Sequence, residues 1–80
     1  MIHTLKILPQ YFEPLIMGIK TFELRKDDRN YQINDILELK EWDGQEYTGR
    51  ETIRQVTYKL KNAPGLDADY CILGIEEGSE

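Results

Sequence analysis

Apolar and polar positions alternate along most of this chain, in short segments separated by turn residues. Alternation with a period of two is typical of β-strands that bury one face. Glycine, proline, asparagine and aspartate residues mark the ends of the segments. The pattern predicts five strands, which are Thr4–Leu8, Thr21–Arg25, Ile36–Trp42, Glu51–Leu60 and Tyr70–Glu76.

The same alternation assigns side chains to the core. Those expected there are Leu5, Ile7, Phe12, Phe22, Leu24, Leu37, Leu39, Ile53, Val56, Tyr58 and Leu60. In the second strand this leaves Thr21, Glu23 and Arg25 on the opposite face. In the fourth strand the inward positions change parity after Ile53, which predicts a β-bulge. The last strand is apolar on both faces and is therefore expected to be central in the sheet.

One segment has helical periodicity. Within Gln10–Met17, apolar residues recur every three to four positions, which predicts a short helix. Pro14 is compatible with a helix if it lies in the first turn. Gly18 follows the last periodic residue and is expected to form a left-handed cap. Asp43-Gly44 predicts a hairpin turn.

These elements predict a mainly β fold with one short helix. Eighty residues suffice for a single domain, 1–80, in which residues 78–80 form a loose tail. Because one short helix cannot cover an open five-stranded sheet, the sheet is expected to close into a small five-stranded β-barrel.

Composition limits the cellular location and the binding partners that we expect for this protein. No apolar run approaches the roughly 18 residues of a membrane span, the start lacks signal-peptide character, and Cys71 is the single cysteine. We therefore expect a cytoplasmic protein with no membrane partner. The net charge of −5 argues against a broadly cationic nucleic-acid surface, but the first thirty residues hold five basic groups against four acidic ones. An anion site is expected in that half.

Several kinds of chemistry lack the residues they need. With one histidine, His3, and one serine, Ser79, a Ser-His-Asp triad is excluded. One cysteine and one histidine cannot form a structural zinc site, and no glycine-rich phosphate loop is present. We expect neither a metal nor a cofactor.

The remaining candidate site is the run from Gly18 to Lys26. Lys20 follows the predicted helix cap, and Glu23 and Arg25 share one strand face about 7 Å apart. Two cations and a carboxylate match a nucleotide, whose phosphate attracts cations and whose base amines donate to a carboxylate. Lys26 adds a further cation. The alternative is an ordinary surface ion pair beside a solvated lysine.

Aromatic side chains near the turns offer stacking surfaces. Tyr31, Trp42 and Tyr47 are positioned to stack on bases. Trp42 breaks the inward alternation of its strand, so packing at a bulge is the alternative for this residue.

The run Gly18-x-Lys20-x-x-Glu23-x-Arg25, behind an amphipathic helix, resembles the signature of activating-signal-cointegrator homology (ASCH) domains, which are similar in fold to PUA domains. Asn34-Asp35-Ile36-Leu37 resembles the start of a family strand. The chain looks closest to the short stand-alone bacterial and phage members. The resemblance implies a PUA-like barrel with a ligand cleft beside the helix, and binding of RNA or nucleotides.

Two other functions stay open. One branch of the family resembles an amidohydrolase of N4-acylated cytidine, with a threonine three residues after the lysine. Here that position is Glu23, so an enzyme would use Lys20, Glu23 and the neighbouring Thr21. The other alternative is a protein-interaction module in which the motif only braces the barrel. The RNA, the base and the oligomeric state stay open.

Overall fold

The computed structural model describes residues 1–77, and the predicted tail at 78–80 lies outside the described residues. Its elements are β1 (Ile2–Ile7), α1 (Pro9–Ile16), β2 (Phe22–Lys26), β3 (Ile36–Trp42), β4 (Tyr47–Leu60) and β5 (Tyr70–Glu77). The prediction of a mainly β fold with one short helix is confirmed. β4 begins earlier than predicted because Tyr47 pairs with Trp42 directly after the Asp43-Gly44 turn.

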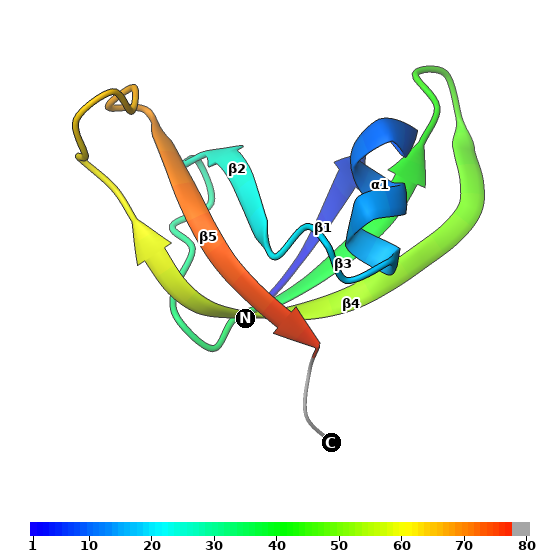
Figure 1. Cartoon of the computed structure of the whole chain (residues 1–80), viewed down its shortest axis with the longest axis horizontal. Helices are drawn as coiled ribbons and strands as arrows, with labels where there is room; N and C mark the ends of the chain where they lie inside the picture. Colours follow the sequence, from blue (N-terminus) through cyan, green and yellow to red (C-terminus); the bar gives the residue numbers. More distant parts are fainter. Residues whose placement is uncertain (78–80) are drawn as a thin grey trace.

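The strands form one sheet in the order β1-β3-β4-β5-β2. The β1–β3 pair is parallel, and the other pairs are antiparallel. Figure 1 shows the sheet curled into a trough, with the long β4 running along its base and α1 inside it, beside β1 and β3. Within residues 1–77, β1 pairs with β3 alone and β2 with β5 alone. The closed barrel predicted from the sequence is therefore corrected to a half-barrel, open between the edges of β1 and β2.

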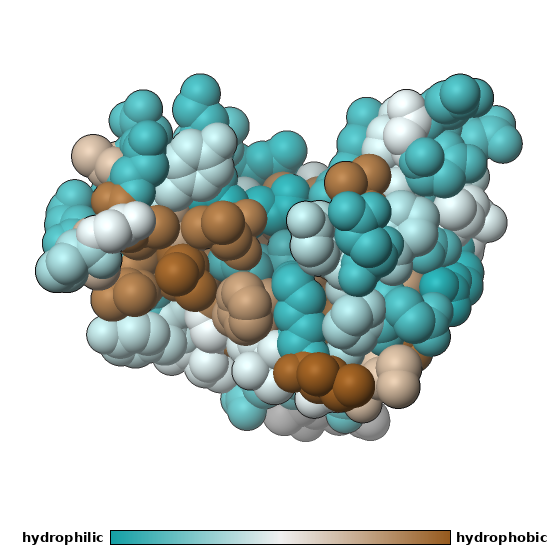
Figure 2. All heavy atoms as spheres, turned by 45° about the horizontal axis from the view of Figure 1, so that its top comes forward, coloured by the Kyte–Doolittle hydropathy of each residue, from teal (hydrophilic) through white to brown (hydrophobic). Residues whose placement is uncertain are grey.

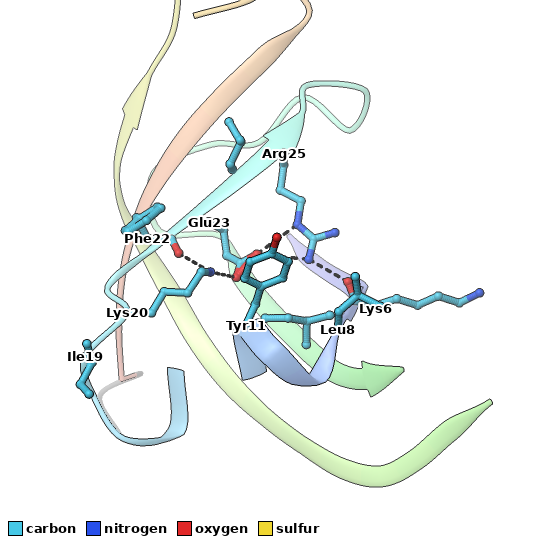
Figure 3. A pocket seen from close by; sticks show the side chains of 10 residues that line it. Lys6, Leu8, Tyr11, Ile19, Lys20, Phe22, Glu23 and Arg25 are labelled. Atoms are coloured by element: carbon cyan, nitrogen blue, oxygen red, sulfur yellow. Dashed lines mark hydrogen bonds and ion pairs between the residues drawn. The ribbon is translucent and has the colours of Figure 1, made fainter. Parts of the chain in front are cut away.

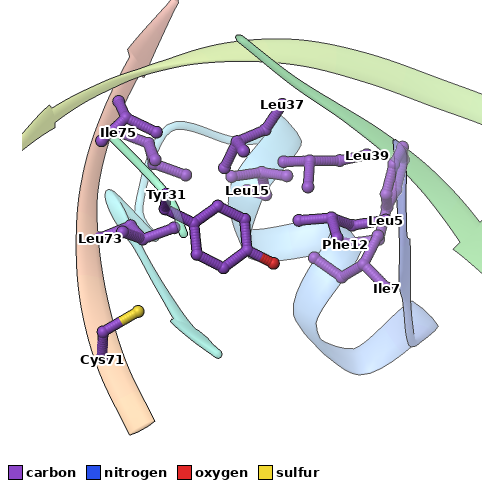
Figure 4. Close-up of a cluster of buried hydrophobic side chains, with 11 residues drawn as sticks. Leu5, Ile7, Phe12, Leu15, Tyr31, Leu37, Leu39, Cys71, Leu73 and Ile75 are labelled. Carbon is purple, nitrogen blue, oxygen red and sulfur yellow. The ribbon is translucent and has the colours of Figure 1, made fainter. Parts of the chain in front are cut away.

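The core fills the concave side of this trough (Figure 4). It consists of Leu5, Ile7, Phe12, Leu15, Tyr31, Leu37, Leu39, Val56, Cys71, Leu73 and Ile75. β5 contributes three of these side chains and lies between β4 and β2, so the prediction of a central last strand is confirmed. Among residues 1–77, no helix is long and apolar enough to cross a membrane.

The inward face predicted for β2 is wrong. Phe22 and Leu24 are 47% and 54% exposed, whereas Glu23 is buried. The register with β5 explains this, because Glu23 lies opposite the buried Leu73 and so shares its inward direction. Alternation shows that two faces of a strand differ but does not say which of them is inside.

The predicted bulge in β4 is confirmed by a register shift between Val56 and Tyr58. Its surroundings differ from the prediction: Ile53 and Tyr58 are exposed, and Leu60 is only half-buried. Arg54 and Val56 point inward before the bulge, and Lys59, opposite Leu73, points inward after it.

Helix α1 begins with Pro9 and contains Pro14 in its second turn, so the condition that Pro14 lies in the first turn is not met. Pro14 has no N–H for the carbonyl four residues earlier, but the helix ends two residues later.

Candidate functional site

The end of α1 fixes the position of Lys20. Gly18 has a φ of 78°, as predicted for a left-handed cap. Its N–H donates to the carbonyl of Leu15 at 3.1 Å, and the N–H of Ile19 donates to the carbonyl of Pro14 at 3.0 Å. These two bonds form a Schellman motif. The N–H of Lys20 also reaches the Pro14 carbonyl, at 3.1 Å, so the backbone of Lys20 is held directly to the helix.

Glu23 is enclosed by two cations. Its side chain is buried, and Lys20 Nζ donates to its Oε1. Arg25 donates from Nε to Oε2 at 3.2 Å, while Lys20 Nζ also donates to the carbonyl of Phe22 at 2.6 Å. Figure 3 shows the lysine and the arginine on either side of the carboxylate. The trio Lys20–Glu23–Arg25 therefore carries one net positive charge.

Arg25 also crosses the open side of the half-barrel. Its Nη2 donates to the carbonyl of Lys6 on β1 at 2.8 Å. Arg29, in the loop after β2, donates in the same way to the carbonyl of Thr4 at 3.0 Å. Two arginine side chains thus stand where backbone hydrogen bonds would close a barrel.

A cavity of about 660 Å³ opens beside the trio, between the β1 and β2 edges. Its lining consists of Lys6, Ile7, Leu8, Tyr11, Ile19, Lys20, Phe22, Glu23, Leu24 and Arg25. The volume is within the range of about 300–1,000 Å³ that is usual for small-ligand sites, as is a mostly apolar lining with a few convergent polar groups. In the space-filling view, the molecule is notched between two lobes, and hydrophobic side chains gather near this hollow (Figure 2).

The structure adds lining residues that the sequence did not indicate. Tyr11 lies on the outer side of α1 and is half exposed, and Figure 3 shows it pointing into the cavity with Leu8. Ile19 and Lys6 complete the wall. For Tyr11 the sequence offered one signal. It is an aromatic residue in the first helical turn, and the core does not need it because Phe12 and Leu15 are the helix residues that are buried there.

The other sequence-predicted residues lie elsewhere. Tyr31 is 1% exposed and packs edge-on against His3, so its ring is not available for stacking. Lys26 and Thr21 are exposed and line no part of the cavity. Trp42 lies on the outer face of β3, beside a register shift. Trp42 and Tyr47 meet edge to face there, with ring centres 5.1 Å apart. Of the predicted site residues, only Lys20, Glu23 and Arg25 line the cavity.

Three further sets of ion pairs and hydrogen bonds stabilise the half-barrel, and the sequence analysis predicted none of them. The buried Asp35 accepts hydrogen bonds from His3 Nε2 at 2.8 Å and from the N-terminal ammonium at 3.0 Å. Burial acts to raise its pKa, but these bonds and one from the Gln32 N–H bring the pKa down to about 2. Arg50 binds Glu41, and Lys59 and Lys61 bind Asp27, so hydrogen bonds to these cations lower the pKa of both carboxyl groups.

The buried polar side chains in the described part of the chain are satisfied by hydrogen bonds. No buried side-chain nitrogen or oxygen in residues 1–77 lacks a hydrogen-bond partner. The same residues contain no group of three histidine, cysteine or acidic side chains placed to hold a metal ion.

Comparison with known proteins identifies a matching family and a similar phage protein. Residues 2–75 match a protein family described as a domain of unknown function, DUF3850. The chain is also 41% identical, over 72 residues, to a protein of Escherichia phage P2 described as an uncharacterized 12.9 kDa protein in the GpA 3′ region. The match covers 90% of this chain and 65% of the phage protein, so the chain spans just under two thirds of its relative.

Proposed function

The chain belongs to the DUF3850 family, and from the geometry of its cavity we propose that it is a module that binds RNA or a nucleotide between the β1 and β2 edges. The observation that carries this proposal is the buried Glu23 held between Lys20 and Arg25 in the wall of a 660 Å³ cavity. Gly18-x-Lys20-x-x-Glu23-x-Arg25 further supports placing the family among the ASCH domains, with a PUA-like fold.

The trio supplies the polar contacts that a nucleotide needs. A lysine ammonium has three donors, of which Phe22 and Glu23 take two, so Lys20 retains one for a phosphate or a ring acceptor. Arg25 has five N–H donors and uses Nε and Nη2 on protein groups, which leaves Nη1 for the ligand. Glu23 keeps lone pairs on both oxygens and accepts from an exocyclic amine. Tyr11, rather than Tyr31, provides the stacking ring.

Electrostatics sets the strength of binding. The trio has one net positive charge, while the whole chain has −5. Binding is therefore weak and involves one or two phosphates, which corresponds to a salt slope of roughly −0.7 per phosphate on a single strand. An affinity that stays constant between low and moderate salt contradicts a phosphate role for Lys20 and Arg25.

The test is an amide NMR titration with short single-stranded RNAs and with mononucleotides at low salt. We expect shifts at Tyr11 and from Ile19 to Arg25. Lys20→Met reduces the affinity about tenfold or more, because a charge-assisted hydrogen bond to phosphate is lost. Lys61→Met is the matched control, since Lys61 pairs with Asp27 outside the cavity. If neither ligand shifts these amides, the proposal is wrong.

A second candidate is a small amidohydrolase of N4-acylated cytidine, and one contact favours it. Lys20 and Glu23 share a hydrogen bond at the cavity wall, which suits transfer of a proton to and from a substrate. The exposed Thr21 is outside the lining, so this mechanism relies on the other two residues. Chromatography of acylated nucleosides tests it: absence of turnover by the wild type, or unchanged turnover by Lys20→Ala, excludes the enzyme.

A third candidate is a protein-interaction module in which the motif only braces the fold. The bond from Arg25 to the Lys6 carbonyl favours it, because it links the two sheet edges. Under this alternative, Arg25→Ala lowers the melting temperature and no nucleotide binds. A variant with normal melting temperature that has lost the ligand excludes a purely structural motif.

A further inference from the structure

A second cluster of cations and aromatic rings lies on the outer face of the half-barrel. Lys6 Nζ lies 3.9 Å from the ring centre of Trp42 and 5.8 Å from that of Tyr47. The two rings meet edge to face with their centres 5.1 Å apart, and Lys40 Nζ lies 6.0 Å from the Tyr47 ring. We refer to Lys6, Lys40, Trp42 and Tyr47 as the outer cluster.

Strand register builds this cluster. In β3, Leu37, Leu39 and Glu41 point inward, so Lys40 and Trp42 point outward. Lys6 on β1 lies opposite Lys40, and Tyr47 on β4 lies opposite Trp42 across the hairpin. Glu51 on β4 lies opposite Lys40 on its other side. The row Lys6–Lys40–Glu51 across the three strands, which we call the lysine row, therefore carries one net positive charge. Tyr47 is 50% exposed.

Lys6 connects the outer cluster to the cavity. Its carbonyl accepts the hydrogen bond from Arg25, and the residue forms part of the cavity wall. Figure 3 shows its side chain running away from Glu23, and the ammonium ends over Trp42. The outer cluster therefore begins where the cavity ends, with one residue of β1 shared between them.

We propose that the outer cluster is a stacking platform for the nucleotides that continue from the one in the cavity, so that the ligand is a single strand of RNA several nucleotides long. This inference rests on the proposed function. Basic side chains interleaved with exposed aromatic rings are the features by which proteins hold single strands without reading their sequence. On binding, a base takes the ring face that Lys6 covers, and the ammonium of Lys6 moves to the adjoining phosphate.

Replacement of the Lys6 ammonium by a base on the ring of Trp42 favours the complex with RNA. Stacking of a base on an aromatic ring is stronger than an exposed cation–π contact, and the displaced ammonium gains a phosphate partner. One or two phosphates match the small positive charge of the lysine row. The platform thus adds affinity for longer strands and none for a mononucleotide.

Trp42 is the only tryptophan in the chain, so its fluorescence reports on the platform alone. The experiment titrates the full chain with a uridine hexanucleotide and with uridine monophosphate, following Trp42 emission and the amide shifts of Lys20 and Glu23 in parallel. We expect the hexanucleotide to quench Trp42 and shift both amides, whereas the mononucleotide shifts the amides only.

Two variants at β4 separate stacking from hairpin stability. Tyr47→Ala weakens hexanucleotide binding by roughly fivefold or more, which is the lower range for one stacked base, and leaves mononucleotide binding unchanged. Tyr58→Ala, at an exposed tyrosine of the same strand, changes neither. Lys6→Met lowers the salt slope by roughly 0.7.

The outcomes separate the two proposals. Amide shifts in the cavity without quenching overturn the platform and leave the proposed function standing. Quenching without cavity shifts overturns the cavity as the RNA site and, with it, the platform as a continuation of the cavity. If nothing changes, both are wrong. If Tyr47→Ala lowers the melting temperature but not the hexanucleotide affinity, the outer cluster only stabilises the hairpin and the platform is overturned.

Discussion

Glu23 gives the candidate site its rigidity at the scale of single residues. It lies on an edge strand yet is buried, because Lys20 and Arg25 satisfy both of its oxygens. A buried carboxylate of this kind costs free energy to desolvate and recovers it only while both cations stay in place. The same contacts hold the two cations at the cavity wall before any ligand arrives.

Glu23→Gln is therefore expected to lower the free energy of unfolding by about 2 kcal/mol, less than for a fully buried pair because Lys20 and Arg25 keep some access to water. Urea denaturation measures the change. Glu46→Gln, in the exposed hairpin turn, is the control and stays within about 0.5 kcal/mol of wild type. Equal stability of the two variants would mean that the trio does not stabilise the fold.

Asp35 makes part of the stability depend on pH. Its pKa falls from 3.8 to about 2 in the folded protein. Because the folded value is lower, the ionised carboxylate contributes roughly 2 kcal/mol above about pH 5, and this contribution is lost as the pH falls through 2. Asp35→Asn removes it, so the unfolding free energy of the variant declines less steeply between pH 5 and pH 2. A wild-type slope in Asp35→Asn contradicts the assignment.

At the scale of elements, the short helix contributes to the candidate site mainly through its C-terminal end. Its eight residues include an internal proline and would be marginal in isolation, but its C-terminal bonds fix the backbone from Gly18 to Lys20. Arg54, which is buried, donates to the carbonyl of Leu15 at 3.1 Å and so links the helix end to β4. The position of the lysine thus depends on helix and sheet together.

Gly18→Ala tests the helix end. Nothing lies within 4 Å of an added Cβ, so the cost is conformational and amounts to about 1 kcal/mol at a φ of 78°. Gly18→Asn costs less, because asparagine tolerates this backbone region. Thermal unfolding measures stability, and the Lys20 amide shift reports whether the helix end has moved. Identical losses for alanine and asparagine would rule out the left-handed cap as the cause.

At the scale of the whole molecule, the open side of the half-barrel is the feature that leaves room for the cavity. Arginine side chains bridge the β1 and β2 edges, where backbone pairing would leave no room for a cavity. Side-chain bridges keep the edges in place while leaving donors accessible to a ligand. The first thirty residues contain both arginines and Lys20, which concentrates positive charge at the opening of an otherwise acidic protein.

Arg29→Gln is expected to loosen this closure without touching the cavity wall. Loss of the bond to the Thr4 carbonyl speeds hydrogen exchange of the β1 amides about threefold, as expected for one exposed charge-assisted bond. Amides paired between β4 and β5 serve as the internal control and keep their rates. Uniform acceleration throughout the sheet would instead indicate global destabilisation.

Local features were readable from the chain. The alternation of Leu37 and Leu39, the glycine after the helix and the close spacing of Lys20, Glu23 and Arg25 each concern neighbours in sequence, whose geometry backbone sterics restrict strongly. Strand and helix existence, the hairpin turn and the bulge in β4 belong to the same group.

The tertiary structure alone decided which faces are inside and what meets across the opening. Glu23 is buried because of its register with Leu73, and Tyr31 is buried because His3, 28 residues earlier, packs against it. Tyr11 reaches the cavity only because the fold brings residues of α1 and β2 into the same lining. Such pairings depend on which distant segments share a register and a core, and a single strand's pattern of polar and apolar residues is the same for either face.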